Sequence, residues 1–154
     1  MTNESPARNR LLLAVAALFM FAIAAGVAQT AQAGPQYVTA VHGYDAVAYF
    51  KDGKPVRGST NATHYWNGAT WLFSSKENRA AFIANPTKYA PQYDGYCAFA
   101  AARGLKAPGD PEVWKIHNGK LYLNVNANVA KRWVKDIDNE IKKANANWAN
   151  INPF

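Results

Sequence analysis

The sequence contains one cysteine, Cys97, among its 154 residues. A single thiol excludes an internal disulfide, so the fold forms without a covalent crosslink within the chain. Cys97 stands in the stretch YAPQYDGYCAFAAARG, which is rich in tyrosine before it and in alanine after it. Free cysteine is among the most buried residue types, so burial is the first expectation. A metal ligand, a nucleophile and an attachment point for another molecule are the alternatives.

Charge is absent from residues 11–28, an apolar run that follows the basic residues Arg8 and Arg10. The small-residue pattern AQA comes next, at 31–33. A basic head, an apolar middle and a small-residue exit predict a secretory signal peptide over residues 1–33. An uncleaved anchor is the alternative, because about 18 apolar residues is near the lower limit for spanning a bilayer. We therefore expect a periplasmic or secreted protein, with no stable membrane insertion after signal cleavage.

Residues 34–154 lack an internal repeat, a low-complexity tract and a linker long enough to divide them, so they predict one domain with a modest core. The formal net charge of the chain is +7. A basic balance suits nucleic acid or an anionic surface. The charges are scattered, however, and an exported protein does not meet nucleic acid. We expect a solvated basic surface and no nucleic-acid partner.

Hydrophobic patterning predicts a small α+β domain. Two stretches place aromatic and β-branched residues on both sides of an Asn-Gly dipeptide, which favours a two-residue hairpin turn. These hairpins are HYWNGATWLF at 64–73 and VWKIHNGKLYLNV at 113–125. Short helices are predicted at 76–85, from Pro86, and at 95–104. A long amphipathic helix follows from about residue 126, with apolar residues at intervals of three and four.

The remaining soft-metal ligands are three histidines. His42 precedes a GYD motif, His64 begins the first hairpin, and His117 lies beside the second hairpin turn. No two ligands have a spacing such as CxxC or HxxxH, so a metal site would need residues that converge in space. A site of Cys97 with one or two of these histidines would suit copper or zinc.

Tyrosines are the candidate ligand-binding residues beside this thiol. Tyr44, Tyr93 and Tyr96 would restrict water and tune a metal or small-ligand site, although core packing is the simpler explanation of such a set. A catalytic Cys97 would need a nearby base and a lowered thiol pKa. A helix starting at Gly95 would favour the thiolate, but the apolar sequence that follows favours burial. No catalytic residue is predicted.

Three ordered motifs carry a family resemblance. They are GYDAVAYF, the hairpin with its NGATW turn, and NPTKYAPQYDGYCA. Together they resemble the YHS domain family, in particular its small exported bacterial branch, over residues 40–148. Metal-binding relatives in the wider family use a short loop, a hairpin and a helix to present cysteines to heavy metals, copper above all. The corresponding positions here are Ala48, Ser74 and Asn78, so the resemblance implies the fold and leaves Cys97 as the one thiol.

Two functions follow from these observations. The first is an exported YHS-type binding protein, non-catalytic, that takes copper or another soft metal through Cys97. The second is a structural or accessory domain that binds a protein or a small organic ligand, with Cys97 in the core. Exposure of the thiol distinguishes them.

Overall fold

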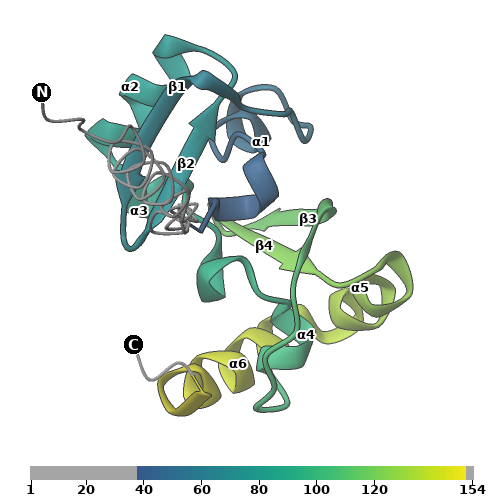
Figure 1. The fold of residues 1–154 in the computed structure, drawn as a ribbon. Helices are drawn as coiled ribbons and strands as arrows, with labels where there is room; N and C mark the ends of the chain where they lie inside the picture. The colour runs from purple at the N-terminus through teal and green to yellow at the C-terminus, as the bar shows by residue number, and fades with distance from the viewer. Residues whose placement is uncertain (1–37, 152–154) are drawn as a thin grey trace, which may run out of the picture. The chain divides into compact units, whose positions relative to one another are not determined.

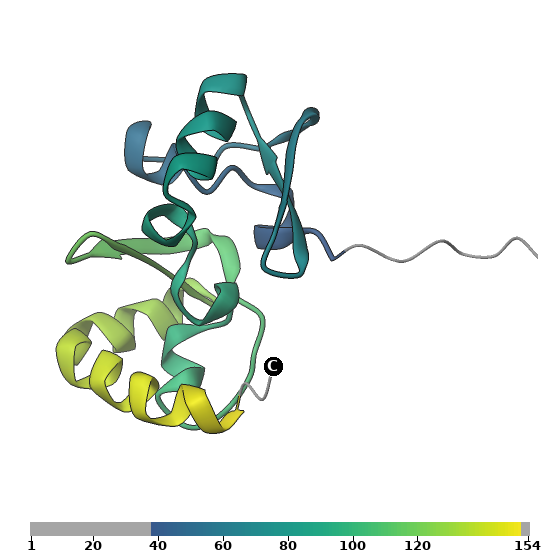
Figure 2. The same ribbon diagram turned by 90° about the vertical axis from the view of Figure 1, so that its left-hand side faces the viewer.

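Two antiparallel β-hairpins organise the chain, and helices follow each of them (Figure 1). The computed structural model describes residues 38–151, so the predicted signal peptide, residues 1–33, lies outside the described residues. We call residues 38–90 the first half and residues 91–151 the second half. Figures 1 and 2 show each half as a separate group of elements built on its own hairpin.

The first half runs from a 3-10 turn to a short helix. Its elements are η1 (Ala40–Gly43), α1 (Ala48–Lys51), β1 (Ser59–Trp66), β2 (Ala69–Phe73), α2 (Lys76–Ala84) and α3 (Pro86–Tyr89). The second half has the same order and ends in a longer helix. Its elements are η2 (Gln92–Gly95), α4 (Ala98–Ala101), β3 (Asp110–His117), β4 (Lys120–Asn124), α5 (Ala127–Trp133), η3 (Val134–Asp136) and α6 (Ile137–Ile151).

The predicted α+β domain with two hairpins, short helices and a long C-terminal helix is confirmed. The helix predicted at 95–104 is shorter than expected, because Gly95 ends a left-handed turn, with φ of +81°, and α4 starts only after Cys97. No helix within residues 38–151 is long and apolar enough to cross a membrane.

The two hairpins share one register, displaced by 51 residues along the chain. The first hairpin begins with the pair Ser59↔Phe73 and the second with Asp110↔Asn124. In both hairpins the register shifts after this first pair, so a bulge bends the longer strand at the same place. Both Asn-Gly turns have positive φ at both residues, as a type I′ turn requires.

A left-handed turn precedes each hairpin, and these turns also correspond. Their residues with positive φ are Val41, His42 and Gly43 in the first half and Tyr93, Asp94 and Gly95 in the second. The N–H of Gly58 donates to the carbonyl of Gly43 at 2.9 Å, and the N–H of Gly109 donates to that of Gly95 at 3.1 Å. A Cβ on Gly58 would lie 2.5 Å from the Leu72 backbone, and one on Gly109 would lie 2.4 Å from the Gly95 carbonyl oxygen. Gly58 and Gly109 therefore have to be glycine, because a side chain at either position would collide with the neighbouring backbone.

A capped helix follows each hairpin. The Ser75 side chain accepts a hydrogen bond from the N–H three residues further on, at 3.0 Å, and Asn126 does the same at 2.9 Å. Both caps satisfy a free N–H of the first helical turn. Phe82 on α2 and Trp133 on α5 are fully buried, each against an aromatic ring of the preceding strand.

The described chain therefore contains one structural unit twice, and the prediction of a chain without an internal repeat is wrong. Identical residues stand at the glycines of the turns, at the Asn-Gly hairpins and at further pairs, among them Tyr44/Tyr96, Ala46/Ala98, Ala48/Ala100 and Leu72/Leu123. The large core side chains mostly differ, as in Phe82 and Trp133 or Phe73 and Asn124.

The second hairpin contributes side chains to the core of the first half. Leu121 and Leu123 of β4 are fully buried in the core cluster of the first half. The Tyr49 hydroxyl donates to the carbonyl of Pro111 at 3.0 Å, and its ring meets Trp114 edge-on with centroids 5.2 Å apart. Burial of this area fixes the first half on β3 and β4.

Candidate functional site

Cys97 is a core residue. Only 1% of its surface is exposed, and its Sγ lies 3.5 Å from Oδ1 of Asn124, to which the thiol donates. The same Asn124 oxygen accepts the backbone N–H of Phe99 at 3.2 Å. The backbone of Cys97 is also fixed, because its N–H donates to the carbonyl of Ala107 at 2.8 Å. The side chain that the sequence analysis proposed as a metal ligand is therefore buried in the protein.

Asp45 occupies the equivalent position in the first half and shows what the fold uses this position for. Its Oδ1 accepts the N–H of Val47 at 2.9 Å. Its Oδ2 accepts the N–H and hydroxyl of Ser74 at 2.8 Å and 2.6 Å, and the side-chain amide of Asn78 at 2.7 Å. The position joins the short helix to the end of the hairpin, and Cys97 joins the same elements in the second half through Asn124.

The three histidines lie on separate elements. His42 is exposed at the end of η1. His64, half-buried in β1, packs against the ring of Phe82 with centroids 6.4 Å apart. His117 on β3 pairs with Asp138 of α6, Nε2 to Oδ1 at 2.7 Å. Among residues 38–151, no group of three or more His, Cys, Asp or Glu side chains is arranged to hold a metal ion. Copper or zinc binding by Cys97 with these histidines stays a prediction.

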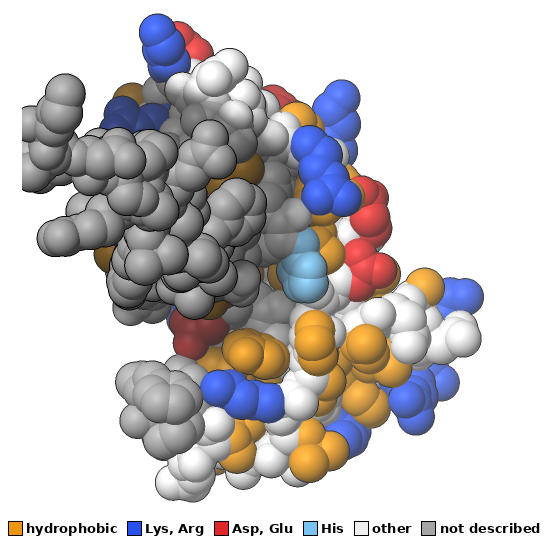
Figure 3. All heavy atoms as spheres, in the orientation of Figure 1, with side chains coloured by type: hydrophobic (Ala, Val, Ile, Leu, Met, Phe, Trp, Pro, Cys, Tyr) orange, Lys and Arg blue, Asp and Glu red, His pale blue; other side chains and the backbone are white. Residues whose placement is uncertain are grey.

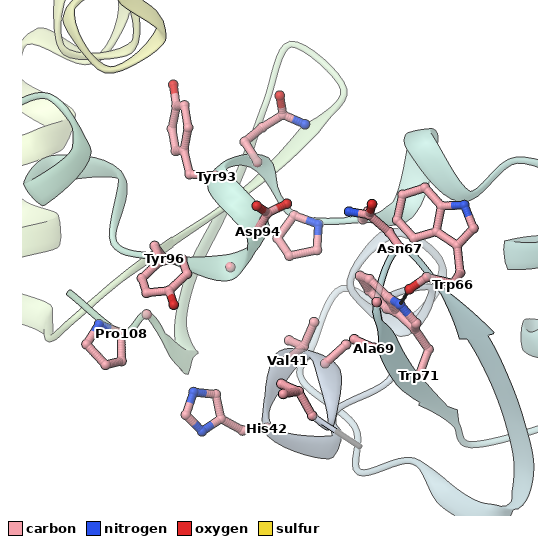
Figure 4. A pocket seen from close by; sticks show the side chains of 18 of the residues that line it. Val41, His42, Trp66, Asn67, Ala69, Trp71, Tyr93, Asp94, Tyr96 and Pro108 are labelled. Carbon is pink, nitrogen blue, oxygen red and sulfur yellow. Dashed lines mark hydrogen bonds between the residues drawn. The ribbon is translucent and has the colours of Figure 1, made fainter. Parts of the chain in front are cut away.

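A cleft does bring some of the predicted residues together. One wall comes from the first half and the other from the second, and each contributes its left-handed turn. Figure 4 shows Val41, Ala69 and Trp71 on one side of this opening, with Asp94, Tyr96 and Pro108 on the other. Of the predicted site residues, His42, Tyr93 and Tyr96 line it, whereas the others lie elsewhere.

Aromatic rings dominate both walls. They are Trp66 and Trp71 in the first half and Tyr93, Tyr96 and Trp148 in the second. Trp66 and Trp71 lie with ring centroids 5.6 Å apart, and the Trp71 indole N–H is satisfied by the Trp66 carbonyl at 2.9 Å. Across the cleft, Trp148 packs on Tyr93 at 5.5 Å and on Tyr96 at 5.8 Å. Trp66, Tyr96 and Trp148 are half-buried and offer flat apolar surface at little further cost in side-chain entropy. Trp71 and Tyr93, in contrast, are only 7% exposed and belong to the core.

Polar groups stand at the edges of these rings. Lys106 places its ammonium over the Tyr96 ring at 4.9 Å and over the Trp148 ring at 5.7 Å, within the range of a cation–π interaction. His42 and Asn67 add polar groups on the opposite wall. The backbone carbonyl of His42 is held by Arg57 Nη1 at 3.0 Å, which fixes the turn.

The predicted tyrosines have different roles. Burial raises the pKa of the Tyr93 hydroxyl, which donates to Asn145 Oδ1 at 2.9 Å, so Tyr93 stays protonated at neutral pH. Tyr44 lies outside the cleft, and its hydroxyl donates to Glu112 Oε1 at 2.7 Å. That hydrogen bond raises the pKa of Tyr44, and the Arg57 guanidinium lies 4.1 Å from its ring centroid. Tyr44 therefore links the halves.

The tryptophans of the cleft were not predicted as site residues. Trp66 and Trp148 lie far apart in sequence and belong to a hairpin and to the last helix. A hairpin position or a helical stripe predicts core packing for each of them, and no local pattern indicates that the two line one cleft.

Charged side chains are distributed over the visible face of the second half. Figure 3 shows Lys and Arg side chains interspersed with hydrophobic ones over the second half, without a continuous basic face in that view. No family model, curated protein or solved structure matches the chain.

Proposed function

We propose that this protein is an exported, non-catalytic binding protein of YHS type, and that it holds a flat organic ligand in the aromatic cleft between its two halves. One observation carries the proposal: five aromatic rings from both halves line one opening, while the only thiol is 1% exposed. Aromatic-lined clefts with a few polar groups at their edges are the usual form of small-molecule sites.

The chemistry of the walls favours a ring-bearing ligand. Trp148 and Tyr96 would stack on the ring, because aromatic contacts favour offset or edge-on packing of flat systems. Lys106 lies beside those two rings, and Asp94 lines the same cleft, so polar groups of both charges stand at its edge. The Asn67 amide on the opposite wall would supply a hydrogen bond that orients the ligand.

The test is a titration of the full chain with 1-naphthoate, followed by tryptophan fluorescence and by calorimetry. We expect saturable binding that Trp148→Ala weakens by roughly tenfold, the effect of about 1.4 kcal/mol. Leu105→Ala is the matched control, because Leu105 is 61% exposed and lies next to Lys106 without lining the cleft. Binding that survives Trp148→Ala unchanged, or the absence of binding, would contradict the proposal.

Metal binding by Cys97 is the second candidate, supported by the single thiol and the YHS resemblance. Copper(I), titrated anaerobically against a competing chelator, tests it in wild type and in Cys97→Ser. Because Cys97 is buried, binding would require local opening, and the thiol should then react with a small alkylating reagent. Tight stoichiometric binding lost in Cys97→Ser would favour the metal over the cleft as the function.

A further inference from the structure

Each half carries a tyrosine directly after its left-handed turn, Tyr44 in the first half and Tyr96 in the second. Both residues have extended backbone, and the N–H of each donates back into the turn. Each also forms an isolated β-bridge, Tyr44 with Arg57 and Tyr96 with Pro108, and these two partners stand 51 residues apart in the chain. The two tyrosines are therefore equivalent in the backbone, so a difference between them comes from their surroundings.

Tyr44 is satisfied within the protein. Its hydroxyl donates to Oε1 of Glu112 at 2.7 Å, and Glu112 belongs to β3 of the other half. The Arg57 guanidinium covers the ring, 4.1 Å from its centroid. Hydrogen bonds to a charged acceptor are stronger than those between neutral groups. A carboxylate oxygen is thus the partner that the fold supplies to the tyrosine at this position.

Tyr96 lacks such a partner and faces the aromatic cleft. The residue equivalent to Glu112 is Asn61 of β1, which is exposed and lies outside the lining of the cleft. Tyr96 is half-buried, and among residues 38–151 no hydrogen bond is found for its hydroxyl. Figure 4 shows this hydroxyl pointing into the open space on the side of His42 and Pro108. The donor that is closed in one half is therefore open in the other.

A ligand in the aromatic cleft would cover this hydroxyl. The Tyr96 ring packs on Trp148 with centroids 5.8 Å apart, and a flat ligand that stacks on these rings displaces the water around them. A donor that loses its water without gaining an acceptor costs free energy, so such a donor discriminates against ligands that lack the acceptor. The open hydroxyl therefore selects flat ligands with an oxygen acceptor at the edge of the ring.

We propose that Tyr96 is a specificity-determining residue of the aromatic cleft, and that its hydroxyl donates to a carbonyl or carboxylate oxygen borne by the ring of the ligand. The inference rests on the proposed binding function and narrows the ligand to aryl ketones, amides and carboxylates, with bare aromatic hydrocarbons bound less well. The ligand oxygen takes the place at Tyr96 that Oε1 of Glu112 takes at Tyr44.

The experiment compares three probes built on one ring system: 1-naphthoate, the neutral ketone 1-acetonaphthone, and naphthalene, which has no acceptor. Each is titrated into the ¹⁵N-labelled full chain, and binding is followed by the indole N–H resonance of Trp148, assigned by its loss in Trp148→Phe. Tyr96→Phe removes the hydroxyl and keeps the ring. We expect this change to weaken the binding of both carbonyl probes by roughly tenfold, the loss of one hydrogen bond, and to leave naphthalene unchanged.

Tyr44→Phe is the matched control, since it makes the same change at the equivalent position outside the cleft. It should leave the affinities for all three probes unchanged. An effect of Tyr96→Phe on 1-naphthoate alone would identify the acceptor as a carboxylate. Equal weakening of naphthalene and the carbonyl probes, or no weakening of any probe, would overturn the role of the hydroxyl while the binding function stands. A wild type that binds none of the three probes would contradict the proposed function itself, and the role of Tyr96 with it.

Discussion

The two halves place an acid and a thiol at the same backbone position, Asp45 in the first and Cys97 in the second. Both are buried, and both connect the short helix to the end of the hairpin. In the first half the acceptor is the Asp45 side chain itself, whereas in the second it is Asn124, which replaces Phe73 on the strand. The equivalent backbone N–H groups, those of Val47 and Phe99, are thus satisfied by a loop side chain in the first half and by a strand side chain in the second. The comparison explains why the second half tolerates a cysteine there.

A second difference concerns the space beside the short helix. Tyr49 is almost fully buried in the first half, and the equivalent residue in the second half is Ala101. α6 begins 51 residues after α3 and is much longer, and it supplies the missing apolar surface there; Ala144 of α6 belongs to the same core cluster as Ala101. One half fills its core with large side chains, and the other uses small residues that let this longer helix approach.

Asp45→Ala should have the largest effect, a loss of about 3–5 kcal/mol in the free energy of unfolding. The change removes the Asp45 acceptor oxygens for the Val47 N–H, for the N–H and hydroxyl of Ser74 and for the Asn78 amide in a buried site, and unmade buried hydrogen bonds are expensive. Urea denaturation followed by circular dichroism measures it. Asp45→Cys, which copies the second half, should cost nearly as much, since Phe73 offers no acceptor. Near-native stability of Asp45→Cys would contradict the conclusion that a cysteine at this position depends on the Asn124 acceptor.

Asn124→Ala should cost somewhat less, about 2–3 kcal/mol, because it removes two hydrogen bonds, whereas Asp45→Ala removes the four described above. The same denaturation experiment applies, with Asn124→Asp as the control that keeps an acceptor oxygen for Phe99. We expect Asn124→Asp to be the more stable of the two variants. The reverse order would show that packing, rather than the hydrogen bonds, decides the effect.

Glu140 tests the longer last helix of the second half, α6. Its carboxylate binds the Arg103 guanidinium at 2.6 Å, which links α6 to the end of α4 and lowers the pKa of Glu140 from its ordinary value of 4.5. A lowered folded-state pKa stabilises the fold above pH 4.5, and this contribution is lost as the pH falls through the folded-state value. Glu140→Gln should therefore lose about 1 kcal/mol at pH 7, since Arg103 is partly exposed and the pair is screened.

Thermal unfolding of wild type and Glu140→Gln between pH 7 and pH 3 measures this dependence. The difference between the two proteins should be constant near neutral pH and should close below pH 4.5. A gap that stays open at pH 3 would exclude the ion pair as its cause.

The sequence predicted the elements better than their arrangement. Local signals identify both hairpins and a serine cap at Ser74 or Ser75, because turn and cap geometry depend on adjacent residues, and Ser75 is the cap in the structure. The repeat and the aromatic cleft depend on tertiary contacts. Asp45 reads as an ordinary turn residue until Ser74 and Asn78 are seen around it, and Trp66 and Trp148 line one cleft only because the two halves pack together. Cys97 is buried, as free cysteines usually are, and its role as a metal ligand stays a prediction.

Cys97→Ser should have the smallest effect, a change of about 1 kcal/mol or less. A hydroxyl is smaller than a thiol but donates a stronger hydrogen bond, so the bond to Asn124 partly offsets the lost packing. Cys97→Ala keeps neither the donor nor the volume and should be the less stable variant. Alkylation of the wild-type thiol by iodoacetamide gives the second measurement, because a residue that is 1% exposed reacts only when the structure opens. Fast labelling of the folded protein, together with equal stability of the Ser and Ala variants, would show that Cys97 is not the second half's substitute for Asp45.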